Sequence, residues 1–392
     1  MIERKYILVA VETAHIQSYI FASNRLRENV GASYLVAAAT GKWALQSVKA
    51  LKVRTNLTVN RSFNDQHIES GDIDVEVLYS GGGNFVALFA DDKFTDEGEL
   101  TLLPDSIARR FIRKLSRKVQ LKAPGLKLTF NAKPFQWSES LSEAVSDVLE
   151  AMKRQRSMQP ALRGDAGLGV QIMCASTSMP AVMDKETRSR EAGNNPWLPY
   201  SAETLAKREA FSKAHDLLDK TLLGETIDAQ SQYTFALKLD DLGRSEGDTS
   251  YIAVVHADGN GLGLLIQGLK ERFPADKNRE YINYMREFSE GVKEVAQKAQ
   301  QEMIQQLVSS IDEIKHHIEG IGPKTQAIEL KQHTDGKFIL PIRPLVSGGD
   351  DVTFVCDGRI GLDLAVTFLS AFEKHSQKIL PTPLTACAGI AI

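Results

Sequence analysis

The sequence predicts an α+β protein with two copies of one β-α-β-β-α-β unit, the ferredoxin-like plan. The first observation is that strand-like runs, rich in β-branched and aromatic residues, alternate with amphipathic helical stretches in this order twice along the 392 residues. The second is a repeated turn, because YSGGGNFVALFA from Tyr79 matches VSGGDDVTFVCD from Val346 turn for turn. Together the two observations predict an internal duplication.

The first unit is expected to start with an alternating apolar strand over 6–11, followed by helical spacing from Ile16 that continues to Val48. A strand over 74–79, a turn over 80–84 and a strand over 85–90 then predict a hairpin. A helical stripe follows, made of Ile107, Phe111, Leu115 and Val119. A strand-like run over 126–131 completes the unit.

The second unit is expected to start with a short apolar strand over 252–255, with Asp258 at its end. A long helix from about Asn278 carries one apolar face, made of Met285, Phe288, Val292, Val295 and Ala299. Apolar strands on both sides of Gly348 and Gly349 predict a hairpin, because glycine adopts a positive φ without a steric clash. A helix over 360–372 and a strand over 384–392 complete the unit.

The duplication predicts three regions along the chain. They are a first domain over 1–134, a mostly helical segment over 135–248 and a second domain over 249–392. The middle segment is expected to hold helices over 138–156 and 201–223. We interpret GDAGLG at Gly164 as a plain loop and the polar run over 242–250 as a linker. The whole segment is interpreted as a helical spacer that sets the angle between the two domains.

The composition is that of a soluble globular protein, with 43% hydrophobic and 25% charged residues. The formal net charge of −3 argues against nucleic-acid binding by bulk electrostatics, although it leaves room for a local basic face. Three cysteines without metal-ligand spacing indicate a reducing compartment. No apolar run has the length of a membrane helix and the first residues lack a signal-peptide pattern, so we expect a cytoplasmic protein with no membrane partner.

Acidic residues are predicted to converge at one edge of the second unit. Asp350 and Asp351 directly follow the glycine pair, although adjacent carboxylates repel each other and are poor strand formers. A right-handed crossover makes the first two strands of the unit parallel, with the third strand antiparallel between them. The hairpin turn therefore lies at the same sheet edge as Asp258. Three carboxylates there can hold two divalent cations about 4 Å apart, and magnesium-type ions usually bring substrate phosphates with them.

This arrangement predicts attack on a phosphorus centre, with one metal activating the attacking oxygen and the other stabilising the leaving oxygen. Because neighbouring residues on a strand point to opposite faces, Asp350 and Asp351 are not expected to be equivalent. Other interpretations are a solvated hairpin turn for the two aspartates and a dinucleotide-binding Rossmann fold for the glycines after Asp258. We interpret His256 as a packed or hydrogen-bonded residue, with a functional role as the alternative.

The first unit differs at the positions where this chemistry would take place. Gly83 and Asn84 stand where the second unit has its two aspartates, and Glu12 is the only acid near the end of the first strand. One carboxylate cannot hold a metal pair, so we interpret this unit as a non-catalytic partner. Its glycine turn can still offer backbone N–H groups to a phosphate or a base. The candidate nucleotide-binding residues of the two units are Ser80, Gly82, Asn84, Gly261, Ser347, Gly348 and Gly349.

Two sets of basic residues are candidates for contacts with anions. Lys270, Arg279 or Arg343 could neutralise the β- and γ-phosphates of a nucleotide. Six further cations lie on the predicted outer face of one helix, and they are Arg109, Arg110, Arg113, Lys114, Arg117 and Lys118. We interpret this face as solvated, with an RNA or partner surface as the alternative.

Four motifs, in this order, resemble those of the large polymerase-cyclase subunit of type III CRISPR effector complexes and its stand-alone relatives. They are IQSYIFASNRLRENVGASYLV from Ile16, SGGGNF from Ser80, HADGNGLG from His256 and RPLVSGGDDVTFV from Arg343. The resemblance implies two palm modules, the second related to the GGDEF turn of diguanylate cyclases, and conversion of ATP to cyclic oligoadenylates with two Mg²⁺ or Mn²⁺ ions. It implies that Asp258 and Asp350 are metal ligands, Asp351 a ligand or close neighbour, and Gly259 a donor of a backbone carbonyl.

The chain departs from this family in three respects. The first strand begins at Tyr6, so we expect no N-terminal HD nuclease domain of the kind that members often carry. The segment between the palms contains only Cys174, so we expect no zinc. The sequence also stops at Ile392, where the family usually continues with a helical domain.

The resemblance leaves two functions open. The first is a nucleotide cyclase that makes a cyclic oligonucleotide signal for antiviral defence. The second is a scaffold, the large subunit of an RNA-guided effector complex that is active only with partner proteins and target RNA. The expected partners are accordingly ATP, and either further copies of the chain or effector proteins and RNA.

Overall fold

The computed structural model describes residues 4–60, 62–91, 94–96, 100–158, 169–182, 198–224, 232–242, 251–320 and 327–392. Within these ranges the protein is a mixed α+β fold with several sheets, which confirms the predicted class. The loop at Gly164 and most of the predicted linker over 242–250 lie outside the described residues. Among the helices described, none combines the length and the apolar character that a bilayer span requires.

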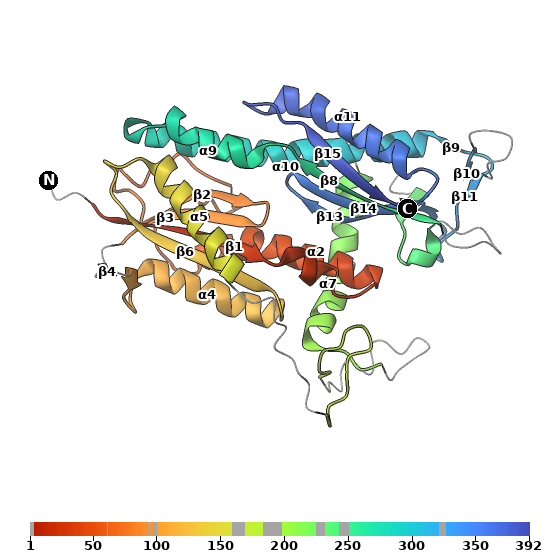
Figure 1. The fold of residues 1–392 in the computed structure, drawn as a ribbon, viewed down its shortest axis with the longest axis horizontal. Coiled ribbons are helices and arrows are strands. Elements are labelled where there is room, and N and C mark those ends of the chain that lie inside the picture. Colours follow the sequence, from red (N-terminus) through yellow and green to blue (C-terminus); the bar gives the residue numbers. More distant parts are fainter. Residues whose placement is uncertain are drawn as a thin grey trace.

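A four-stranded antiparallel sheet forms the centre of the first half of the molecule (Figure 1). In spatial order its strands are β2 (Val75–Gly81), β3 (Asn84–Ala90), β1 (Tyr6–Ala14) and β6 (Lys127–Phe135). Successive residues of β1 point to opposite faces, so that Ile7 and Val9 join one apolar core while Leu8 and Ala10 join another. Both faces of this sheet are therefore buried.

Helices cover the two faces of the first sheet. On one face lie α1 (Ile16–Ile20), α2 (Leu26–Ala38), the π-helical turn η1 (Ala39–Trp43), α3 (Ala44–Lys49) and α4 (Ile107–Lys122). Ser106 caps α4 by accepting a hydrogen bond from the backbone N–H of Arg109 at 3.3 Å. Phe111 of α4 stacks on Phe85 of β3, with ring centroids 5.0 Å apart. The opposite face carries α5 (Leu141–Met158), which contacts β1 and β6.

A second four-stranded antiparallel sheet repeats the spatial order of the first. Its strands are β13 (Ile342–Gly348), β14 (Asp351–Asp357), β8 (Ile252–Gly259) and β15 (Ala386–Ala391), and its helices are α9 (Leu262–Arg272), α10 (Asn278–Ser309) and α11 (Gly361–Ile379). Both hairpins also shift register at the same place, between Val77 and Tyr79 in β2 and between Pro344 and Val346 in β13. The two halves therefore agree in local detail as well as in element order.

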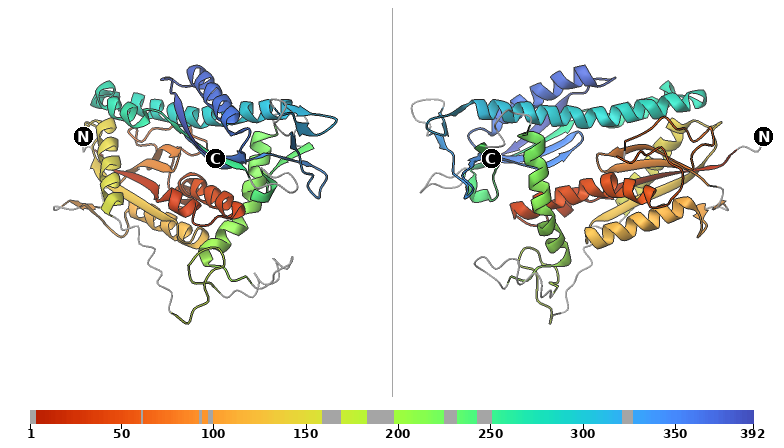
Figure 2. Two further views of the ribbon diagram at one scale, coloured as in Figure 1. Left: turned by 45° about the vertical axis from the view of Figure 1, so that its right-hand side comes forward. Right: turned by 180° about the vertical axis from the view of Figure 1, so that it is seen from behind.

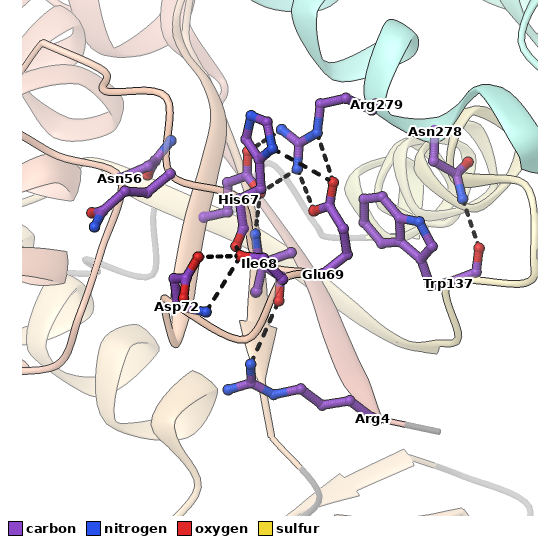
Figure 3. Close-up of polar contacts among 12 residues, drawn as sticks. Arg4, Asn56, His67, Ile68, Glu69, Asp72, Trp137, Asn278 and Arg279 are labelled. Atoms are coloured by element: carbon purple, nitrogen blue, oxygen red, sulfur yellow. Dashed lines mark hydrogen bonds and ion pairs between the residues drawn. The ribbon is translucent and has the colours of Figure 1, made fainter. Parts of the chain in front are cut away.

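The long helix α10 joins the two halves. It runs along both sheets in Figure 2 and contacts β2 as well as β13 and α11. Glu76 of β2 is fully buried and accepts hydrogen bonds from Arg279 at 2.6 Å and Arg286 at 2.7 Å, both on α10. Figure 3 shows Arg279 also reaching Glu69, which precedes β2. One apolar core contains residues of both sheets, among them Leu88 and Phe354.

The remaining elements are short or lie between the halves. Helix α7 (Ala202–Leu222) begins after its cap Ser201 and packs against α2. Small sheets pair β4 (Phe94–Asp96) with β5 (Leu100–Leu102), β7 (Tyr233–Phe235) with β12 (Phe338–Leu340), and β10 (His317–Ile318) with both β9 (Ile311–Asp312) and β11 (Ile328–Glu329). Two 3₁₀ turns, η2 (Leu239–Asp241) and η3 (Ala275–Lys277), complete the described structure.

Candidate active site

The glycine turns of the two halves lie face to face. A Cβ atom on Gly349, in the β13–β14 turn, would stand 3.5 Å from the Cα of Gly82 in the β2–β3 turn. Gly349 has a φ of 77° and Gly82 a φ of 58°, values that favour glycine because it has no Cβ. Two turns that are far apart in the sequence therefore lie side by side, close enough that a Cβ on Gly349 would be in ordinary van der Waals contact with Gly82.

A cavity of ≈ 200 Å³ lies where these turns meet. Its wall is formed by the β2–β3 turn, by one side of α10, by Leu149 of α5 and by the first turns of α9. Five of the sequence-predicted site residues line it, and they are Ser80, Gly82, Asn84, Gly349 and Asp350. The cavity is thus shared between the two halves, as a site for a ligand held by both would be.

The other predicted nucleotide-binding residues surround the cavity without lining it. Gly261 lies at the start of α9 with a φ of 74°. Ser347 accepts a hydrogen bond from the side chain of Gln300 on α10 at 2.8 Å, and Gly348 pairs with Asp351 across the hairpin. The hydroxyl group of Ser80 donates to the backbone carbonyl of Thr40 at 2.8 Å, so this side chain already has a protein partner.

Three carboxylates influence one another at this end of the second sheet. Burial, with additional repulsion from Asp351 and Asp258, raises the pKa of Asp350 to about 6. Burial and the charge of Asp258 also raise the pKa of Asp351, whereas His256 lowers it. Asp258 itself is exposed at the end of β8. Because a nearby negative charge disfavours ionisation, the site as it stands carries repulsion that a cation would relieve.

The two adjacent aspartates lie on different sides of the hairpin. Val352 pairs with Ala257 of β8, and both side chains enter the apolar core. The next pair in this register is Asp351 with Asp258. Because successive residues of a strand point to opposite faces, this pair lies on the face of the sheet that is turned away from that core. Asp350 instead lines the shared cavity, and Asp351 does not.

His256 lies beside Asp351 on the same side of the sheet. Its Nε2 atom is 3.6 Å from Oδ1 of Asp351, and its Nδ1 atom forms a hydrogen bond of 2.8 Å with the hydroxyl of Thr353. This hydrogen bond agrees with the interpretation of His256 as a packed or hydrogen-bonded residue. The sequence itself indicates that His256 lies on the same face of the strand as Asp258. Residues two apart on a strand share a face, and His256 precedes Asp258 by two positions.

Two of the three basic residues proposed for phosphate binding lie elsewhere. Arg279 is bound to Glu69 and Glu76 (Figure 3). Arg343 is fully buried, and its guanidinium group lies 3.0 Å from Nδ1 of His215 on α7. The predictions for these two arginines are therefore wrong, because each is committed to a buried contact.

Lys270, the third of these basic residues, lies 3.9 Å from Asp147 and does not line the cavity either. Other charged residues line the cavity instead. Lys293 and Glu290 of α10 do line it, and neither is among the residues predicted from the sequence. No local pattern marks them, because only the path of α10 across both halves brings them to the turns.

The donor atoms at the site suit a hard divalent cation that arrives with other ligands. Within the described ranges, no group of three or more His, Cys, Asp or Glu side chains is arranged to hold a metal ion. Magnesium is commonly held by one or two carboxylates, with water and substrate phosphates as the remaining ligands. Asp258, Asp350 and Asp351 are all oxygen donors with mutual repulsion, so they fit an ion that binds together with a polyphosphate.

The corresponding acid of the first half is already engaged. Glu12 pairs with Asn84 in the sheet, and its carboxylate forms an ion pair with Arg156 of α5. Burial raises the pKa of Glu12 and the charge of Arg156 opposes that effect. At this end of β1, the part of the first half that the structure describes thus places one carboxylate, which is held by an arginine.

Comparisons with known proteins yield similar folds only. No protein-family model matches the chain, and no curated protein matches it. The crystal structure of Csm1 in T. onnurineus has a TM-score of 0.47 at 12% identity and matches 100% of this chain over 49% of its own length. A Csm1–Csm4 cassette in complex with AMPPNP has a TM-score of 0.47 at 13% identity. The match covers 100% of this chain and 50% of the chain in that structure.

A further Csm1–Csm4 cassette, in complex with pppApA, has a TM-score of 0.46 at 12% identity. The match covers 100% of this chain and 50% of the chain in that structure. The chain thus spans about half the length of the solved structures that it resembles. At this identity the likeness carries neither an activity nor a partner over to this chain.

Proposed function

We propose that the protein is a nucleotidyltransferase that joins ATP molecules into a cyclic oligonucleotide of the cyclic oligoadenylate type, a second messenger for antiviral defence. The observation that carries the proposal is that Asp350 lines a cavity shared by two facing glycine turns, with Asp258 and Asp351 close enough to influence its charge. In this proposal residues 249–392 form the catalytic palm, residues 1–134 a non-catalytic palm, and residues 135–248 the spacer between them. Four sequence motifs that resemble the polymerase-cyclase family support the same assignment.

Each half has its own part in the proposed reaction. Asp258, Asp350, Asp351 and the backbone carbonyl of Gly259 would hold two Mg²⁺ or Mn²⁺ ions, which when bound neutralise phosphate charge and acidify the attacking hydroxyl. The Gly348–Gly349 turn lets the second half's backbone approach the triphosphate of one ATP. The Gly82–Asn84 turn of the first half holds the other ATP through backbone N–H groups.

The reaction itself is a substitution at phosphorus. The ribose hydroxyl of the second ATP gives its proton to water and attacks the α-phosphorus of the first, which forms a new P–O bond. The bond between that phosphorus and the oxygen bridging to the β-phosphate breaks, and pyrophosphate leaves with this oxygen and the electron pair. Repetition followed by ring closure gives the cyclic product. Most of the acceleration comes from alignment of the reactants and from charge stabilisation, as in other phosphoryl transfers.

An assay with labelled ATP tests the proposal directly. Purified protein is incubated with ATP and Mg²⁺ or Mn²⁺ without RNA, and the products are separated by chromatography. A cyclic product that the Asp350→Asn variant does not make is expected. Absence of any product with either metal, from protein whose fold is verified by circular dichroism, would refute a stand-alone synthase.

A second candidate function is the large subunit of a type III CRISPR effector complex, active only with its partners and target RNA. The basic outer face of helix α4, whose residues do not line the cavity, favours this alternative. The same assay separates the two functions when partner proteins and target RNA are added. Product that appears only after this addition identifies the subunit.

A further inference from the structure

Helix α4 carries an unusual concentration of positive charge. Its sixteen residues, IARRFIRKLSRKVQLK, contain seven arginines and lysines and no acid. The whole chain, in contrast, has 47 basic and 50 acidic residues. The apolar side of the helix, with Phe111, Leu115 and Val119, is buried against the first sheet, so the charges gather on the outer side.

The charges of α4 form two rows along the helix. Residues four apart lie above one another on a helix surface, which aligns Arg109 with Arg113 and Arg117, and Arg110 with Lys114, Lys118 and Lys122. Like charges at this spacing destabilise a helix. Arg109 and Arg110 also lie near the positive end of the helix dipole, with no acidic residue in the first turn. The helix therefore holds repulsion that a polyanion would relieve.

The centre of the two rows is open to a ligand. Arg113, Lys114 and Arg117 are exposed, and none of them forms an ion pair with an acid in the part of the chain that the structure describes. Two large apolar side chains of this half are also exposed, since Leu121 of α4 is 72% exposed and Phe130 of β6 is 44% exposed. Phe130 pairs with Val11, which faces the core under α4, so Phe130 lies on the same face of the sheet as this helix.

We propose that the outer face of α4, together with Phe130, binds a single strand of nucleic acid. Arg113, Lys114 and Arg117, the exposed cations at the centre of the rows, contact successive backbone phosphates, and the exposed aromatic ring offers a base a stacking surface, which a duplex cannot use. Figures 1 and 2 show α4 on the side of the first sheet opposite to α5 and α10, so this surface is separate from the cavity. The proposal goes beyond the proposed reaction and does not depend on it.

Fluorescence anisotropy with a labelled 20-nucleotide single-stranded RNA and the full chain, without ATP, tests this surface. The variant combines Arg113→Glu, Lys114→Glu and Arg117→Glu. Its control combines Lys213→Glu, Lys220→Glu and Lys378→Glu, which changes the net charge equally at exposed positions of α7 and α11. We expect the α4 variant to weaken binding by about tenfold or more. The slope of log K against log salt should also fall by about 2, because each lost phosphate contact lowers it by about 0.7.

Three further outcomes decide the proposal. Phe130→Ala should weaken binding of the single strand by about fivefold or more and leave binding of a duplex of the same sequence unchanged, because base stacking contributes about 1–3 kcal/mol. Equal losses in the α4 variant and its control would overturn the proposal in favour of general charge attraction. Competition by polyglutamate as strong as that by unlabelled RNA would overturn it in favour of an acidic protein partner. ATP turnover, measured separately, does not enter any of these results.

Discussion

A Cβ atom placed on Gly259 would lie 2.9 Å from the Cβ of Asp350, closer than real side chains approach. Gly259 ends β8 and Asp350 lies in the β13–β14 turn, so the absence of a side chain at Gly259 lets the turn lie against the end of the central strand. This close approach brings Asp350 against the end of the strand that carries Asp258, and it needs no positive φ at Gly259.

The first prediction follows from this contact. Gly259→Ala should displace Asp350 and reduce product formation from ATP by about 100-fold, a loss typical of a misplaced catalytic group. The matched control is Gly268→Ala in α9, where an added Cβ meets nothing within 4 Å. The control should keep its activity and gain a little stability, since alanine is favoured over glycine in a helix. Wild-type activity in Gly259→Ala would contradict the placement of the turn.

The second prediction concerns the unequal positions of Asp350 and Asp351. Asp350 lines the shared cavity, whereas the side chain of Asp351 is 50% exposed on the other side of the strand. Asp350→Ala should therefore lower the rate by about 100-fold to 1000-fold, the range seen when a preorganised charge-stabilising group is removed. Asp351→Ala should leave measurable product. Equal and mild effects of the two changes, in steady-state assays with Mg²⁺, would rule out the metal-site assignment.

The third prediction concerns the buried carboxylate between β2 and α10. Glu76→Gln should destabilise the protein at pH 7 by about 3–5 kcal/mol, because Arg279 and Arg286 lose their buried counter-charge. Glu69, which contacts Arg279 and is 25% exposed, provides the comparison. Glu69→Gln should cost less than about 1 kcal/mol. Urea denaturation at a fixed temperature measures both differences.

The same glutamate predicts a dependence of stability on pH. Burial alone raises the pKa of Glu76, but hydrogen bonds and charges from Arg279, together with the charge of Arg286, outweigh it and lower the pKa below 4.5. A carboxyl with a lowered folded-state pKa contributes stability above its unfolded-state value and loses it as pH falls through the folded-state value. The difference between wild type and Glu76→Gln should therefore shrink below pH 4.5. A difference that stays constant from pH 7 to pH 3 would contradict this account.

The fourth prediction concerns the contact between α2 and α7. A Cβ on Gly31 would overlap the backbone carbonyl oxygen of Lys207, and backbone cannot move aside as a flexible side chain does. Gly31→Ala should lower the free energy of unfolding by about 1–3 kcal/mol or more. Gly41→Ala is the control, because nothing lies within 4 Å of an added Cβ there. Equal stability of the two variants would mean that the two helices do not pack through Gly31.

Much of the fold follows from local sequence patterns. The strands around both glycine turns and the helix that starts at Asn278 lie where the patterns predict them, although exact bounds differ by a few residues. The helix expected from Ser138 begins at Leu141, for example, and the strand expected from Leu384 begins at Ala386. Short pairings such as β7 with β12 have no such pattern, because a three-residue strand is too brief to show a period.

By itself, the sequence determined the strands of the two repeated hairpins and the long helices beside them, because alternation, helical spacing and glycine's tolerance of positive φ act over a few residues. It did not mark the helix α9 or the short strands β4, β5 and β9 to β12. Only the tertiary structure decided that Gly82 lies against Gly349, that Lys293 reaches the cavity and that Arg279 is bound to Glu76. Those contacts depend on how α10 packs across both sheets, and such long-range packing is set by the shapes of buried surfaces that meet only in the folded protein.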